Sequence, residues 1–278
     1  MSRRAVLTWV AVTILAATSA FSRELESETV AAWESYVAFT EARIESELEG
    51  GQDGQHGQGF LVMDFLGGAE RAECRRLVES GEVCVLKRTT LDDEGKTILV
   101  PGGMIHHWYG AVLVPDVAIA SVLEFVQSYD DSARFYPEVE DSRLLGHEGD
   151  VFEIFLRLKR KKILTVHYNT EHKVTYRSHS DTRASARSLA IRIREISNPD
   201  ENNESEKPFG DDHGFLWRLS SYWRFEQTPE GTMVECESIS LSRSVPAAAR
   251  WLVKSYIDSV PRESLESTLA PIRENLAP

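Results

Sequence analysis

Two pairs of histidines are the residues of this sequence best suited by type to bind a metal ion. His106 and His107 are neighbours in a segment with the composition of a strand, and His167 and His172 lie five residues apart in another. Side chains at an odd spacing on a strand point to opposite faces, so neither pair can hold one ion without distortion of the backbone. We therefore predict no metal site, and a hydrogen-bonding role for the strand histidines.

Serine-based catalysis would require a nucleophile in a recognisable setting. Ser220, Ser221 and Ser238 are available, but none stands in a Gly-x-Ser-x-Gly motif, and the chain has no glycine-rich phosphate-binding loop. The motifs therefore predict no catalytic residue and no cofactor.

Charged residues on two successive strand-like segments form another group. Arg218 and Arg224 share one face of the first segment, and Glu235 and Glu237 share one face of the second. If the segments form a hairpin across residues 228–231, these charges can pair between strands. Two interpretations stay open: an exposed ladder of ion pairs that adds little stability, or contacts from Arg218, Arg224 and Glu235 to the polar head group of a ligand.

Large apolar side chains alternate with polar ones on the same segments and on an earlier strand. They are Trp217, Leu219, Trp223 and Phe225 on the one, and Phe152, Ile154 and Leu156 on the other. Each set occupies one face of its strand. Such residues either line a cavity or fill a solid core, and the pattern alone fits both.

The N-terminus has the three parts of a secretory signal peptide. Basic Arg3 and Arg4 precede an apolar run that ends in Thr18-Ser19-Ala20, small residues at the positions that a signal peptidase recognises. The run is shorter than the roughly 20 residues that cross a bilayer, which disfavours an uncleaved anchor. We predict a signal peptide over residues 1–20, cleaved after residue 20 or 22, and a periplasmic or secreted protein.

Three cysteines, Cys74, Cys84 and Cys236, remain in the exported chain. In an oxidising compartment Cys74 and Cys84 are the candidate disulfide, since a short helix carries one and the strand that follows carries the other. The alternative is three buried thiols.

The formal net charge of −13 restricts the partners of the protein. It repels nucleic acid and anionic membrane surfaces on average, so we predict no nucleic-acid partner and, at most, transient contact with a membrane. The basic run over residues 157–162 is interpreted as a solvated hairpin turn.

The residues that follow the signal peptide predict an accessory segment over 23–100. It would contain a helix over 24–48, a glycine-rich linker, and then a strand, a short helix and a strand at 60–66, 69–79 and 82–90. The segment is too short to be an independent unit, so we expect it to pack on, or extend the sheet of, the domain that follows.

From residue 101 a different order of elements begins. A strand at 104–114 and a helix from 117 to about 129 precede six strand-like runs, at 139–145, 151–158, 163–176, 185–196, 215–225 and 232–241. Their alternation predicts an antiparallel sheet with one buried face, and the polar run 198–212 predicts a loop. A long helix starts at Pro246, and Pro261 predicts a kink or break near Val260.

This order of elements and several short sequence segments resemble the START/polyketide cyclase-like superfamily, which includes coenzyme Q-binding members. The segments are Asp141-Ser142-Arg143-Leu144-Leu145, Phe215-Leu216-Trp217-Arg218, Ser221-Tyr222-Trp223-Arg224-Phe225, and the run 238–246 before the last helix. The resemblance covers residues 103–276. It implies an α+β helix-grip fold over 101–278, in which a curved antiparallel sheet wraps a long C-terminal helix, with the N-terminal helix and hairpin as additions.

The resemblance also implies an apolar cavity between the sheet and the C-terminal helix. The two apolar strand faces would line it, and Trp251 and Tyr256 would face it from the helix. Such a cavity suits a lipid, a quinone or a polycyclic molecule. The first hypothesis is an exported, non-enzymatic binding or transfer protein; the alternatives are a cyclase- or hydrolase-like enzyme that uses the same cavity, and an interaction module with a filled core.

Overall fold

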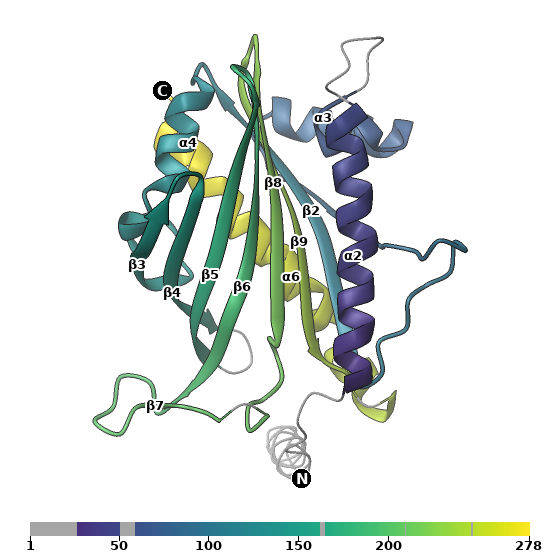
Figure 1. Cartoon of the computed structure of the whole chain (residues 1–278), viewed down its shortest axis with the longest axis vertical. Coiled ribbons are helices and arrows are strands. Elements are labelled where there is room, and N and C mark those ends of the chain that lie inside the picture. The colour runs from purple at the N-terminus through teal and green to yellow at the C-terminus, as the bar shows by residue number, and fades with distance from the viewer. Residues whose placement is uncertain (1–26, 51–58, 162–164, 209, 246) are drawn as a thin grey trace, which may run out of the picture.

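A computed structural model describes residues 27–50, 59–161, 165–208, 210–245 and 247–278, without the side chains of 247–258. The predicted signal peptide over 1–20 lies outside these residues. Figure 1 shows a large curved sheet between two long helices, with α2 (Ser27–Gly50) in front and α6 (Ala247–Leu276) behind. This is the predicted α+β helix-grip fold with an N-terminal accessory helix.

The sheet has nine strands and is antiparallel throughout. Its order is β1-β2-β9-β8-β6-β5-β4-β3, and β7 pairs with β6. The strands are β1 (Cys84–Lys87), β2 (Gly103–Pro115), β3 (Val139–Glu148), β4 (Val151–Lys161), β5 (Thr165–Ser180), β6 (Arg183–Ser197), β7 (Ser205–Glu206), β8 (Arg218–Thr228) and β9 (Gly231–Arg243). The runs predicted from residue 101 onward therefore all contain strands, and β8 and β9 form the expected hairpin.

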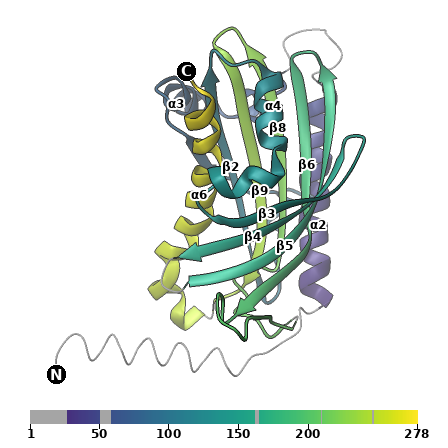
Figure 2. The same cartoon turned by 90° about the vertical axis from the view of Figure 1, so that its left-hand side faces the viewer.

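The sheet separates two apolar clusters, one on each face. We call the face that carries α6 the inner face and the face that carries α2 the outer face (Figures 1 and 2). A row of registered residues, Gly110, Cys236, Trp223 and Ala186, crosses the inner face from β2 to β6. Because side chains alternate along a strand, the neighbours of these residues point outward.

Helix α6 packs mainly over β1, β2 and β9, and against α4 (Ile119–Gln127). Leu265 and Leu269 of α6 are buried against Gly110 of β2. A Cβ atom at Gly110 would lie 2.6 Å from Leu269 Cδ1, so the absence of a side chain permits this close approach. The second half of α6 therefore packs closely on the sheet.

Two details of the C-terminal and central predictions differ from the structure. Of the kink or break predicted near Val260, the break is absent, since α6 continues through Pro261 as one helix. A proline removes one N–H donor, and the packing of the following turns on β2 compensates for that loss. The basic run was predicted to be a turn, yet Arg157 and the residues up to Lys161 belong to β4, where Arg157 pairs with Glu140 and Glu204.

The accessory segment packs on the sheet and extends it, by β1 pairing with β2. The predicted hairpin is wrong, because the run 60–66 contains the 3-10 helix η1 (Val62–Phe65) in place of a strand. The Asp64 carboxylate accepts hydrogen bonds from the N–H groups of Phe60 and Leu61, at 2.9 and 3.0 Å. This local bonding competes with a strand ladder.

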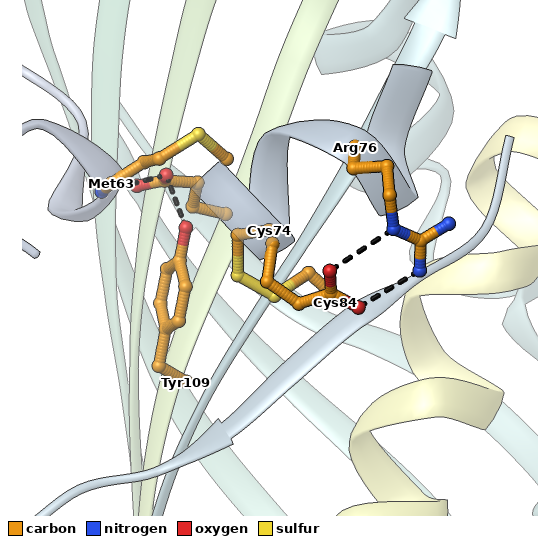
Figure 3. Close-up of a disulfide and its surroundings, with 7 residues drawn as sticks. Met63, Cys74, Arg76, Cys84 and Tyr109 are labelled. Carbon is orange, nitrogen blue, oxygen red and sulfur yellow. Dashed lines mark hydrogen bonds and ion pairs between the residues drawn. A yellow bond between two sulfur atoms is a disulfide. The ribbon is translucent and has the colours of Figure 1, made fainter. Parts of the chain in front are cut away.

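A disulfide joins α3 (Gly68–Glu79) to β1 through Cys74 and Cys84, the two cysteines singled out in the sequence. Both are fully buried, and their Cα atoms are 5.1 Å apart. Figure 3 shows the bridge beside Tyr109 and Met63, with the ion pair of Arg76 on the solvent side. Cys236 is a buried free thiol on the inner face.

Candidate functional site

The inner face brings together most of the apolar residues that the sequence placed in a cavity. Phe152 and Ile154 of β4 and Phe225 of β8 are buried in one cluster, and Leu156 and Trp223 are partly buried against it. β4 and β8 lie on opposite sides of β6 and β5, so the cluster spans the width of the sheet. The side chains of Trp251 and Tyr256, predicted to complete it from α6, lie outside the described residues.

The inner face has two parts that differ in packing. Near the second half of α6, Val112, Val234 and Phe225 have 1% or less of their surface exposed. On the same face, Leu219 and Trp223 of β8 and Leu156 of β4 keep intermediate exposure, although they point to the side on which α6 lies. Large inward-facing side chains that retain accessible surface indicate a part of the interior that is not packed to the density of a core.

A line of polar side chains on β5 crosses this same face: Tyr168, Thr170 and His172, all buried. Nε2 of His172 and the Thr170 hydroxyl are 2.9 Å apart, and the hydroxyl donates to the Leu156 carbonyl oxygen at 3.0 Å. Thr170 thus accepts from His172, whose ring is neutral because burial lowers its pKa to about 4. Burial also raises the pKa of Tyr168 well above its ordinary value, so its hydroxyl keeps its proton.

Charged groups at the end of this line are paired with one another. Arg160 of β4 forms an ion pair with Glu138 and donates to the carbonyl oxygen of Val260 at 3.3 Å. Glu195 of β6 pairs with Lys207 and accepts the backbone N–H of His213 at 2.9 Å. Burial raises the pKa of Glu195, but the hydrogen bonds from His213 and Lys207 outweigh it and leave the pKa below its usual value.

The outer face is different, because buried charges fix α2 to it. Glu237 of β9 accepts hydrogen bonds from His107 Nε2 and from the guanidinium of Arg43. His107 Nδ1 accepts the Tyr36 hydroxyl at 2.8 Å, and that hydroxyl accepts the Thr90 N–H at 2.8 Å. Burial raises the pKa of Glu237, but the bonds to His107 and the charge of Arg43 outweigh it and bring the pKa to about 2. Glu237 is therefore an anion, and burial lowers the pKa of His107, which keeps the ring neutral.

A second buried carboxylate fixes η1 to the outer face. Glu235 accepts the Val62 and Met63 N–H groups and the Tyr109 hydroxyl, the last at 2.6 Å. Burial raises the pKa of Glu235 to about 7. Its neighbour Arg224 donates to the Phe60 carbonyl oxygen at 2.9 Å and pairs with Glu47 of α2.

These contacts correct three of the sequence-based assignments. Arg224 and Glu235 face α2 and η1, so they are neither an exposed ladder nor head-group contacts of a ligand on the inner face. Trp217 precedes β8 and packs with Ile239 and Leu241 in the outer cluster, rather than beside Trp223. Arg218 borders a surface hollow of about 360 Å³, together with Arg192 and Arg194, near the edge where β6 and β8 separate.

Sequence reasoning missed Tyr36, Arg43 and Glu47, which carry the outer network. The only signal was that Thr29, Tyr36 and Thr40 continue the helical spacing of Trp33, Ile44 and Leu48, and all six are buried. The histidine prediction agrees with the geometry, since His107 lies in the outer network and His106 bonds to Ser242. Among the described side chains, no group of three His, Cys, Asp or Glu residues is arranged to bind a metal. No helix within the described ranges is long and apolar enough to cross a bilayer.

The comparisons with known proteins found similarity to solved structures at low sequence identity. No family model and no curated protein sequence matches the chain. Among solved structures, it is similar to a STAR-related lipid transfer protein from Xanthomonas axonopodis, at 18% identity and a TM-score of 0.45, over 63% of this chain and 94% of that one. It is also similar to the Zhui aromatase/cyclase from Streptomyces sp. R1128, at 10% identity and a TM-score of 0.44, over 62% and 94% of the two chains. The lipid transfer and protein localization domain of human StarD13 matches at 10% identity and a TM-score of 0.42, over 77% and 98%.

Proposed function

We propose that this protein binds a hydrophobic small molecule between the inner face of the sheet and α6, and works as an exported binding or transfer protein. The observation that carries the proposal is the incomplete packing of Leu156, Leu219 and Trp223, which keep accessible surface on the face of the sheet that carries α6 (Figure 2). Apolar surface in such a place gains free energy when a ligand replaces water on it.

Binding without turnover fits the polar groups of this face better than catalysis does. The described contact of His172 is with Thr170, and the Thr170 hydroxyl is committed to the Leu156 carbonyl oxygen. A general base needs an available nucleophile or substrate proton within hydrogen-bond distance, and a pKa near the working pH. His172, with its pKa lowered to about 4, meets neither requirement in this arrangement.

Export is supported by two independent features. The N-terminal pattern is that of a signal peptide. In addition, Cys74 and Cys84 form a disulfide, a bond that persists in oxidising compartments and is rare in the cytosol.

Native mass spectrometry of the protein purified from the exported fraction tests both parts of the proposal. We expect a complex heavier than the polypeptide, which releases an apolar molecule into organic solvent. The stripped polypeptide should begin at Phe21 or Arg23 and be two mass units lighter than its fully reduced form. A ligand-free protein that takes up no added lipid or quinone would contradict the binding function. A membrane-bound product that retains residues 1–20 would contradict export.

A further inference from the structure

The Tyr168 hydroxyl lies on the inner face and has no hydrogen-bond partner among the described residues. Its side chain is only 4% exposed, and the hydroxyl oxygen is fully buried. Tyr168 is registered with Leu158 of β4 and with Glu195 of β6, and it shares its face with Thr170 and His172. Of the buried side-chain atoms in the described residues that lack a partner, it is the one on this face, since the others belong to α3 or point outward.

An unpartnered buried hydroxyl is rare in folded proteins, because the hydrogen bonds that it made to water are not replaced. Such a group in a loosely packed interior is available to a ligand. Because burial keeps Tyr168 protonated, its hydroxyl can donate a hydrogen bond to an oxygen atom.

The charges that surround Tyr168 determine which kind of oxygen fits. Arg160 and Glu195 are the charged side chains near its hydroxyl on the neighbouring strands, and Asp212 adds a negative charge. Arg160 is paired with Glu138, and Glu195 with Lys207 and His213, while the Asp212 carboxylate accepts the indole N–H of Trp217. A carboxylate or phosphate brought here would displace one of these pairs or stay unpaired, and a buried charge without a partner is costly.

Building on the proposed function, we propose that the ligand is an uncharged hydrophobic molecule with a carbonyl or hydroxyl oxygen, which accepts a hydrogen bond from Tyr168. Long-chain ketones, alcohols and quinones have this chemistry. Fatty-acid anions and phospholipids with a charged head group do not.

Two probes of equal chain length, decan-2-one and decanoate, test this inference at pH 8, where decanoate is ionised. Trp108 and Trp223 of the inner cluster report binding through their emission. We expect wild-type protein to bind decan-2-one at least tenfold more tightly than decanoate. Tyr168→Phe should weaken decan-2-one binding about five- to tenfold, the effect of one hydrogen bond between neutral groups, and leave decanoate binding unchanged.

Tyr222→Phe is the matched control. It also removes one buried tyrosine hydroxyl, but that group bonds to Glu41 at 2.8 Å on the outer face. We expect this variant to lose stability and to keep the wild-type preference for decan-2-one. Tyr168→Phe should melt no lower than wild type, because the removed hydroxyl has no hydrogen-bond partner within the described part of the chain.

The outcomes separate the inference from the function on which it rests. Wild-type protein that prefers decanoate overturns the inference even if the variant cannot be purified. A Tyr168→Phe protein that binds decan-2-one as tightly as wild type overturns it as well. In both cases binding itself, and therefore the proposed function, stands. If neither probe changes the tryptophan emission of wild type, the function and the inference fail together.

Discussion

The buried polar groups on the two faces of the sheet differ in their charge and in their hydrogen-bond partners. On the outer face, Glu237 and Arg224 are buried charges and Glu235 is a buried acid with a pKa of about 7, and each has partners from α2 or η1. On the inner face the polar groups of β5 are neutral, and Tyr168 has no partner among the described residues. Paired charges fix two elements in one arrangement, whereas an unpaired neutral group leaves a contact for a ligand to make. The difference fits a stabilising role for the outer face and the proposed ligand binding at the inner one.

The largest effect should come from removing a charge on the outer face. Glu237→Ala leaves the His107 N–H without its acceptor and removes one of the two carboxylates that Arg43 contacts, the other being Glu47; loss of one partner of a buried ion pair costs about 3–5 kcal/mol. Urea denaturation followed by circular dichroism should show that loss. The matched control is Glu73→Ala, which breaks an exposed pair with Arg76 and should leave the free energy of unfolding nearly unchanged, because solvent screens exposed charges. Equal stability of the two variants would show that α2 is not held by these charges.

A smaller effect on stability is expected from Glu235, and its dependence on pH is opposite to that of Glu237. Its folded-state pKa of about 7 lies above the unfolded value near 4.5, so the folded protein binds the extra proton between these pH values. Its contribution to stability is complete below about pH 4.5 and declines as the pH rises through 7. Glu237, whose pKa is lowered to about 2, contributes in the reverse direction and loses its stabilisation as the pH falls below about 4.5.

The Glu235→Gln variant isolates that contribution, because the amide imitates the protonated acid. Thermal melts from pH 4.5 to 8 should show a downward slope for wild type, on the order of 3 kcal/mol over the range, and a much flatter profile for the variant. The same slope in both proteins would mean that groups other than Glu235 cause the change of stability with pH.

The smallest change in stability is expected on the inner face. Trp223 is only partly buried, so Trp223→Phe should lower the free energy of unfolding by less than about 1 kcal/mol. It should also reduce the change in tryptophan emission when an apolar ligand binds, because Trp223 lies beside the proposed ligand. A filled core would give the opposite result: a loss of about 1 kcal/mol or more, and no response to any apolar ligand in the parent protein.

The strands and the faces of their residues could be predicted from the sequence, because both depend on local patterns of residues. Alternation in residues such as Phe152, Ile154 and Leu156 predicted the strands and the face that they share, because that pattern depends only on neighbours in the chain. The strand predicted from Phe60 onward does not form, because the carboxylate of Asp64, four residues away, accepts the backbone N–H groups that a strand would use.

The outer network could not be predicted, because its partners are remote in sequence. The sequence placed Glu235 and Glu237 on one face of a strand correctly, but nothing in their surroundings indicated that α2 would cover that face. Arg43 reaches Glu237 across 194 positions, and Arg224 reaches Glu47 across 177. Whether such charges form a surface ladder or a buried network depends on tertiary packing that one sequence does not display.

The pairing of β2 with β9 determines when this protein can fold. Arg43 is made early, yet Glu237, which it contacts, follows 194 residues later, and the ladder of β2 is complete only when β9 pairs with it. Contacts of such long range slow folding, since the intervening chain must be ordered before they form. The half-made chain would carry α2 with its charged side uncovered and β2 with an open edge. Such a chain must keep α2 and the open edge of β2 from forming other contacts until the residues of β9 have been made.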